Sequence, residues 1–274
     1  MDNLINISFI ALILSIPILY RFLRSGSSSI FYFRGVLSKG QNYKRAEFLR
    51  FIQVLIGFFF LLIHSFTFLG LGNLILFLFL SVGVSFLFEI TGIKTGITFG
   101  GFFNYDIKGN GPIIFEVPIF IILTWYGLMY MSFSYVVFIL KLDSLIFSNF
   151  SIFEIGTISL YCGLSIMLLD LTLDPIGVDE KRWSWTIPGA YYGIPYLNFL
   201  GWFLCCFITV FLFLLFFSIE NLNSFDQINK VPLFLYSLLP IIASRPCFER
   251  NLKFPGYFGI FYGMCLTILL IFYR

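Results

Sequence analysis

Apolar residues fall into eight stretches along the chain, separated by shorter segments that hold most of the charged residues. A helix needs about 20 apolar residues to cross a bilayer. Lipid offers no hydrogen-bond partners to the backbone, so each stretch is expected to be helical. The sequence therefore predicts an all-α, polytopic transmembrane helix bundle of about eight spans. The spans are Leu4–Tyr20, Phe48–Leu69, Leu71–Ile90, Ile113–Leu140, Ile152–Leu173, Ile194–Ile219, Val231–Ser244 and Gly256–Tyr273.

The seventh stretch is short and contains Pro232 and Pro240, so seven spans are the alternative. No long Pro, Ser or Gly linker and no repeat of fixed period divides the chain. We therefore expect a single transmembrane domain over residues 1–274.

Basic residues separate the loops of this bundle into two sets. One set carries only Lys141, Lys230 and Arg274, and the rest of the 17 Lys and Arg residues fall in the other. Cytoplasmic loops collect Lys and Arg, so the second set should face the cytoplasm and the N-terminus the outside. The first apolar run lacks a small-residue cleavage site and is expected to be retained. We predict a multi-pass protein of the inner (cytoplasmic) membrane.

Composition supports the membrane interpretation and narrows the chemistry. Apolar residues make up 59% of the chain and charged residues 11%, with a mean hydropathy of +0.95. A soluble domain carries roughly 25% charged residues. The five cysteines show no metal-binding spacing, and the only histidine, His64, excludes a site built from several histidines. The glycines match no nucleotide-binding motif, so neither a metal, a nucleotide nor a nucleic-acid partner is expected.

Four carboxyl groups are candidates for acid–base chemistry. Asp170 and Asp174 lie four positions apart at the end of the fifth span, hence on one helical face. Mutual repulsion, the negative helix end and partial burial favour a protonated acid there, and Glu89 ends the third span in the same way. Glu116 lies near the start of the fourth span, where the helix end favours the anion. We hypothesise that Asp170, Asp174 or Glu89 donates a proton and Glu116 accepts one.

The alternative is that the acidic residues only form ion pairs at the level of the lipid headgroups. Lys94, Lys181 and Arg182 are the available partners. This alternative is strongest for Asp179 and Glu180, which adjoin Lys181 and Arg182 in the sequence.

Aromatic residues are dense in the loop that follows Asp174. Aromatic faces near a protonated alkene would stabilise a carbocation by about 2 kcal/mol or more when desolvated. The turn-forming residues Pro188, Gly189, Gly193 and Pro195 indicate an ordered re-entrant or interfacial loop. An ordinary interfacial belt is the competing interpretation. The candidate substrate-binding residues are Trp183, Trp185, Tyr191, Tyr192, Asn198 and Trp202.

Several motifs within residues 85–205 resemble the membrane family of carotenoid biosynthesis that contains bacterioruberin-precursor hydratases and gamma-carotene hydratases. They are residues 89–96 with Phe99-Gly100, Val117-Pro118 with Trp125, residues 170–175 with Trp183-Ser-Trp185, and residues 189–195 with residues 198–202. The resemblance adds Trp125 to the candidate substrate-binding residues. Phe102-Phe103 departs from the more polar pattern expected of the family.

The resemblance implies cofactor-free addition of water to the terminal 1,2 double bond of an acyclic carotenoid, giving a tertiary alcohol. Protonation at C2 would place the positive charge on tertiary C1, which water then captures. The implied partners are the carotenoid, water, membrane lipid and other enzymes of carotenoid biosynthesis. No cofactor is expected, and the site should lie toward the cytoplasmic face.

Two other function classes compete with the hydratase. The Asp170–Asp174 spacing is similar to the aspartate pairs that hold diphosphate through Mg²⁺ in membrane aromatic prenyltransferases, although no second copy is present. A non-catalytic transporter would need polar residues deep in several spans, which here consist mostly of Phe, Leu and Ile. A requirement for Mg²⁺ would indicate the prenyltransferase, and an unchanged pigment after gene deletion would indicate the transporter.

Overall fold

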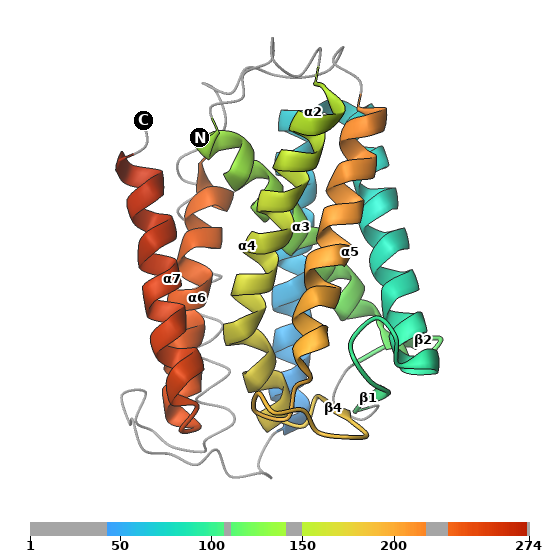
Figure 1. Cartoon of the computed structure of the whole chain (residues 1–274), viewed down its shortest axis with the longest axis vertical. Helices are drawn as coiled ribbons and strands as arrows, with labels where there is room; N and C mark the ends of the chain where they lie inside the picture. The colour runs from blue at the N-terminus through green and yellow to red at the C-terminus, as the bar shows by residue number, and fades with distance from the viewer. Residues whose placement is uncertain (1–42, 107–110, 141–149, 218–229, 273–274) are drawn as a thin grey trace.

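The computed structural model of the chain describes residues 43–106, 111–140, 150–217 and 230–272, with side chains from residue 51 onward. Within these ranges six helices are long and apolar enough to cross a membrane, as in a multi-pass membrane protein (Figure 1). They are α2 (Tyr43–Thr95), α3 (Ile119–Ile139), α4 (Ile152–Asp179), α5 (Tyr196–Phe216), α6 (Val231–Glu249) and α7 (Lys253–Phe272).

Helix α2 is two helical arms that meet at Gly70, whose backbone is non-helical with φ 75° and ψ 169°. His64 on the first arm (residues 43–69) and Phe77 on the second (residues 71–95) both contact Tyr130, with ring centroids 5.7 and 5.9 Å away. A straight helix would hold residues 64 and 77 roughly 20 Å apart along its axis. The chain therefore reverses at Gly70, as Figure 1 shows.

The two arms correspond to the second and third predicted spans. The first predicted span, Leu4–Tyr20, and the N-terminus lie outside the described residues, so the eight-span count and the outward N-terminus stay predictions. The remaining predicted spans each contain one helix, although their boundaries differ from those expected.

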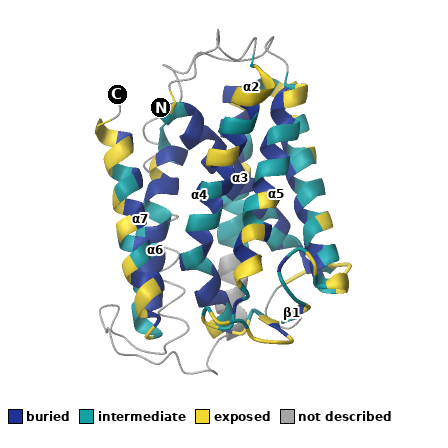
Figure 2. Cartoon of the chain, viewed as in Figure 1, coloured by how far each residue is buried: buried dark blue, intermediate teal, exposed yellow. Residues whose placement is uncertain are grey.

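Helix α3 lies at the centre of the bundle. Its most apolar stretch is 78% buried, compared with 28% for the candidate span in α2. Large apolar side chains cover the outer surface instead, and Phe79, Phe153 and Phe272 are each more than 70% exposed. Figure 2 shows this difference between the buried interior and the outer sides of helices such as α7. An apolar exterior of this kind suits a lipid environment.

The loops that follow α2 and α4 pair with each other at one end of the bundle. Strand β1 (Phe103–Tyr105) is antiparallel to β4 (Trp183–Trp185), with Asn104 opposite Ser184. The indole of Trp185 also donates a hydrogen bond to the Phe99 carbonyl at 3.0 Å. This pairing joins the two loops that carry most of the sequence motifs.

The fourth predicted span begins later than the sequence pattern indicated. Residues 113–118 form a hairpin of β2 (Ile113–Ile114) and β3 (Val117–Pro118), and α3 starts only at Ile119. Phe115 and Glu116 make its turn with φ values of 47° and 70°, in the left-handed region. Pro118 restricts the preceding residue to extended backbone, which ends the hairpin before the helix can start.

Helix α4 continues past the predicted end at Leu173 and contains Pro175. Proline has no N–H to donate to the carbonyl four residues earlier, which is that of Leu171. The hydroxyl of Tyr191 donates to this carbonyl at 2.8 Å. Tyr191 thereby satisfies the group that Pro175 leaves open, and the loop after β4 is fixed to the end of α4.

Candidate functional site

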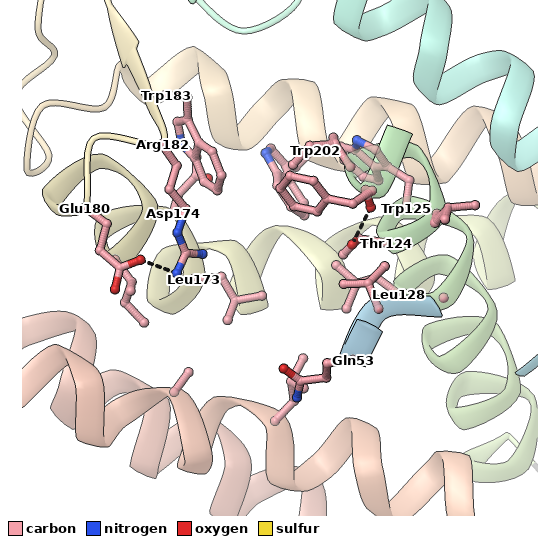
Figure 3. Close-up of a pocket in the computed structure, with 18 of the residues that line it drawn as sticks. Gln53, Thr124, Trp125, Leu128, Leu173, Asp174, Glu180, Arg182, Trp183 and Trp202 are labelled. Carbon is pink, nitrogen blue, oxygen red and sulfur yellow. Dashed lines mark hydrogen bonds and ion pairs between the residues drawn. The ribbon is translucent and has the colours of Figure 1, made fainter. Parts of the chain in front are cut away.

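A cavity of about 810 Å³ opens between α2, α3, α4 and α6, close to the β1–β4 ribbon (Figure 3). Seven of the candidate residues line it, from four helices and the ribbon. They are Glu89, Trp125, Asp174, Trp183, Trp185, Asn198 and Trp202. The structure thus brings together residues from positions 89 to 202.

Asp170 and Asp174 form one pair held by Asn198. The amide nitrogen of Asn198 donates to Asp170 Oδ2 at 2.9 Å and to Asp174 Oδ2 at 2.6 Å. Both carboxyl groups are buried, and Asp170 Oδ1 has no hydrogen-bond partner. Asn198 lies in the first turn of α5, so the packing of α5 on α4 brings the amide to the acids. The predicted common face of Asp170 and Asp174 is confirmed.

Glu89 is held separately, by two donors on its two oxygens. The Tyr105 hydroxyl lies 2.7 Å from Oε2 and the Trp125 indole nitrogen 2.8 Å from Oε1. Burial, followed by the charge of Glu89, raises the pKa of Tyr105 well above its usual value. Tyr105 therefore stays protonated and donates, so Glu89 is placed as an acceptor of hydrogen bonds.

Aromatic rings surround the carboxyl groups. The rings of Trp125 and Trp202 have centroids 4.2 Å apart, and those of Tyr105 and Trp183 are 6.1 Å apart at 75°. The Trp183 indole lies against α4 at Gly177, where a Cβ atom would be only 2.1 Å from the ring. Glycine at this position therefore lets the indole reach the cavity wall beside Asp174.

Ion pairs form a second polar part of the cavity wall. Glu180 pairs with both Arg182 and Arg250, and Arg250 Nε is also 3.4 Å from Asp179. These contacts join the end of α4 to the end of α6. The predicted ion pair with Arg182 is thus confirmed for Glu180, whereas Asp179 pairs with Arg250, a partner that the sequence did not suggest.

Four candidate residues do not line the cavity. Glu116 is exposed in the β2–β3 turn, outside the helix at whose start it was predicted. Tyr191 bonds to α4, and Tyr192 is 40% exposed with its ring against that of Tyr191. Asp170 is also absent from the lining but reaches it through Asn198.

Sequence reasoning missed Tyr105 and Arg250 as parts of the site, and it named Arg182 only as an ion-pair partner of the acids. Tyr105 is placed by the pairing of β1 with β4, and Arg250 comes from the far end of α6. The only local signal for Tyr105 was its position within the aromatic loop after Glu89. In the described residues, no group of three or more His, Cys, Asp or Glu side chains is arranged to hold a metal ion.

Comparisons with known proteins show the family to which the chain is similar. A family model described as "Carotenoid biosynthesis protein" matches residues 49–266, a range wider than the one that holds the motifs. A bisanhydrobacterioruberin hydratase of Haloarcula japonica is 31% identical over 126 residues. That match covers 46% of this chain and 39% of the length of the hydratase. No solved structure matches the chain.

Proposed function

The chain belongs to the carotenoid biosynthesis protein family, and from this premise we propose that it is a membrane carotenoid 1,2-hydratase. Its substrate would be an acyclic carotenoid end, to whose terminal double bond it adds water. One observation carries the proposal: buried carboxyl groups and indole rings meet at one largely apolar cavity. The partial match to a hydratase supports the same reaction class.

The Asp170–Asp174 pair is the proposed acid. Two carboxyl groups that share one amide donor in a buried site repel strongly when both are ionised. The pair therefore holds a proton, which Asp174 delivers because it is the member that lines the cavity. The π electrons of the terminal bond form the new C–H bond at C2, and the positive charge appears on tertiary C1.

Indole rings and a carboxylate would stabilise this cation. Trp125, Trp183 and Trp202 line the cavity around Asp174, and a cation over such a ring gains about 2 kcal/mol or more when water is excluded. Glu89 is the proposed carboxylate, because Tyr105 and Trp125 both donate to it. In this proposal Glu89 replaces Glu116 as the proton acceptor.

The second half of the reaction uses water. Its oxygen forms the C–O bond at C1, and one of its protons passes to Glu89. Return of that proton through water to the aspartate pair restores the starting state. The sum is the addition of one water molecule without oxidation or reduction, so the proposed reaction is cofactor-independent.

Water would enter from the end of the cavity that carries Glu180, Arg182 and Arg250. These charged groups belong to the loops whose basic residues predict a cytoplasmic position. The proposed site therefore faces the cytoplasm, where the polar rim can admit water and the helices can admit the polyene from lipid.

The test replaces each aspartate of the pair with asparagine, which has nearly the same shape but no carboxyl proton to donate. Asp174→Asn and Asp170→Asn, expressed in cells that accumulate lycopene, should reduce hydrated pigment about 10²- to 10⁴-fold. Glu154→Gln is the matched control, because Glu154 is exposed in the capping box at the other end of α4 and Gln can serve there. Mass spectrometry of the pigments measures the gain of water. Equal amounts of hydrated pigment from wild type and both Asn variants would refute the role of the aspartate pair as proton donor.

The same cells separate the competing classes. Product that appears only with Mg²⁺ and a prenyl diphosphate would indicate a membrane prenyltransferase. Pigments that do not change when the gene is removed would indicate a transporter.

A further inference from the structure

Besides the residues around the carboxyl groups, one face of the first arm of α2 and one face of α6 line the cavity, and we call this part the channel. The lining residues are Gln53, Gly57 and Leu61 on α2, and Leu235, Leu239 and Ile242 on α6. Figure 3 shows Gln53 near α6, across the open space from Trp183 and Trp202.

Regular spacing makes each wall continuous along the helix axis. Residues 53, 57 and 61 recur every four positions, which places them on one helical face. At a rise of 1.5 Å per residue this face runs for roughly 12 Å. Leu128 on α3 completes the channel beside Trp125. Apart from Gln53 these side chains are apolar, so this part of the cavity suits a hydrocarbon chain rather than a polar group. The charged lining residues of α6 are Arg245, Glu249 and Arg250, at its C-terminal end.

Gly57 is one of three glycines in the described helices, with Gly83 and Gly156, at which a built Cβ atom meets no other atom within 4 Å. Of these three, only Gly57 lines the cavity. Glycines in membrane helices commonly allow close helix packing. Gly163 does so here, because its Cβ would lie 2.8 Å from the Phe203 ring. Gly57 instead faces open space in the channel wall, so its lack of a side chain adds width rather than contact.

We propose that Gly57 is a specificity-determining position, which keeps the channel wide enough for the polyene chain next to the reacting end. The inference rests on the proposed function, because it takes the carotenoid as the occupant. A side chain at position 57 would project into the space that the polyene needs, while the carboxyl groups stay in place.

Gly57→Leu tests this with Gly83→Leu as the matched control. Gly83 lies on the second arm of the same helix, also has no atom within 4 Å of a built Cβ, and does not line the cavity. Both variants and wild type are purified in detergent from cells that make lycopene. Absorbance gives bound lycopene per protein, and mass spectrometry gives hydrated product.

Gly57→Leu should bind at least tenfold less lycopene and form at least tenfold less product, whereas Gly83→Leu should match wild type. Wild-type binding by Gly57→Leu, or an equal loss in Gly83→Leu, would overturn the inference. Should Gly57→Leu fail to fold, Gly57→Ala against Gly83→Ala replaces it, with about threefold weaker binding expected and equal binding overturning the proposal.

The two readouts separate this inference from the proposed reaction. Suppose that wild type binds lycopene, that Gly57→Leu does not, and that neither forms hydrated product. That result would support the role of Gly57 in polyene binding and refute the proposed hydration. Hydration by wild type that Gly57→Leu leaves unchanged would refute the channel alone. A wild-type protein that neither binds nor hydrates lycopene would refute both.

Discussion

Two of the buried polar clusters in the described helices differ in charge and in access. The carboxyl cluster comprises Glu89, Asp170, Asp174 and Asn198 and borders the cavity. The tyrosine cluster comprises His64, Ser65, Tyr126 and Tyr130 and lies between the first arm of α2 and α3. Both occupy positions where an unpaired polar group would destabilise the fold.

The tyrosine cluster is paired within itself. His64 Nδ1 is 2.6 Å from the Tyr130 hydroxyl, and Ser65 Oγ is 2.6 Å from the Tyr126 hydroxyl. None of these four described residues lines the cavity. The cluster therefore acts as a cross-link between helices, as most buried polar groups do.

The carboxyl cluster has more acceptors than donors. Asn198 supplies one amide group to two aspartates, and Asp170 Oδ1 has no partner. Such an arrangement lowers the stability of the fold unless protons bound to the carboxyl groups supply the missing hydrogen-bond donors. The difference between the clusters teaches that a surplus of buried acids beside a cavity indicates a reactive site, whereas a cluster whose polar groups pair with one another indicates a role in helix packing.

The largest effect in this comparison is expected for Glu89→Gln. Loss of the carboxylate should lower hydration about 100-fold or more, because the amide is a poor proton acceptor and does not balance a cation. Thermal stability in detergent should stay equal or rise, because the substitution removes a buried charge. A variant that hydrates at the wild-type rate would contradict the role of Glu89.

A matched pair of hydroxyl deletions sharpens the contrast. Tyr105→Phe should lower hydration about tenfold, because Glu89 loses one of its two donors. Tyr130→Phe should leave hydration unchanged and lower the free energy of unfolding by about 1 kcal/mol, because it removes one buried hydrogen bond. Pigment mass measures hydration, and thermal unfolding measures stability. Lower hydration by Tyr130→Phe together with unchanged hydration by Tyr105→Phe would contradict the distinction between the clusters.

The smallest effect is expected for Glu116→Gln. Its side chain is exposed in the β2–β3 turn, so pigment yield should stay within about twofold of wild type, as for other surface substitutions. A large loss of product would restore Glu116 as the acceptor that the sequence pattern suggested.

The sequence predicted those features of the site that depend on local periodicity. The four-residue spacing of Asp170 and Asp174 placed both on one face of α4, and the motif that contains Asn198 led into the next helix. Glu116 was misplaced because the apolar run from Ile113 looks like a helix, whereas its first residues form a hairpin.

Features that depend on contacts between distant segments could not be predicted. Tyr105 reaches Glu89 because β1 pairs with β4, whose residues lie almost 80 positions later. Arg250 meets Glu180 only through the packing of α4 and α6. The periodicity of a single sequence indicates neither contact, which is why the sequence identified the acids, Asn198 and Trp125 but not Tyr105 and Arg250.

Hydration of lycopene in D₂O by the purified protein tests the central claim most directly. The account predicts a product with one carbon-bound deuterium at C2, beside the new tertiary alcohol, formed by wild type without added cofactor. Asp174→Asn should form almost none of it. A hydroxylated product without deuterium at C2, or the same product formed by Asp174→Asn at the wild-type rate, would contradict protonation by the buried aspartate pair.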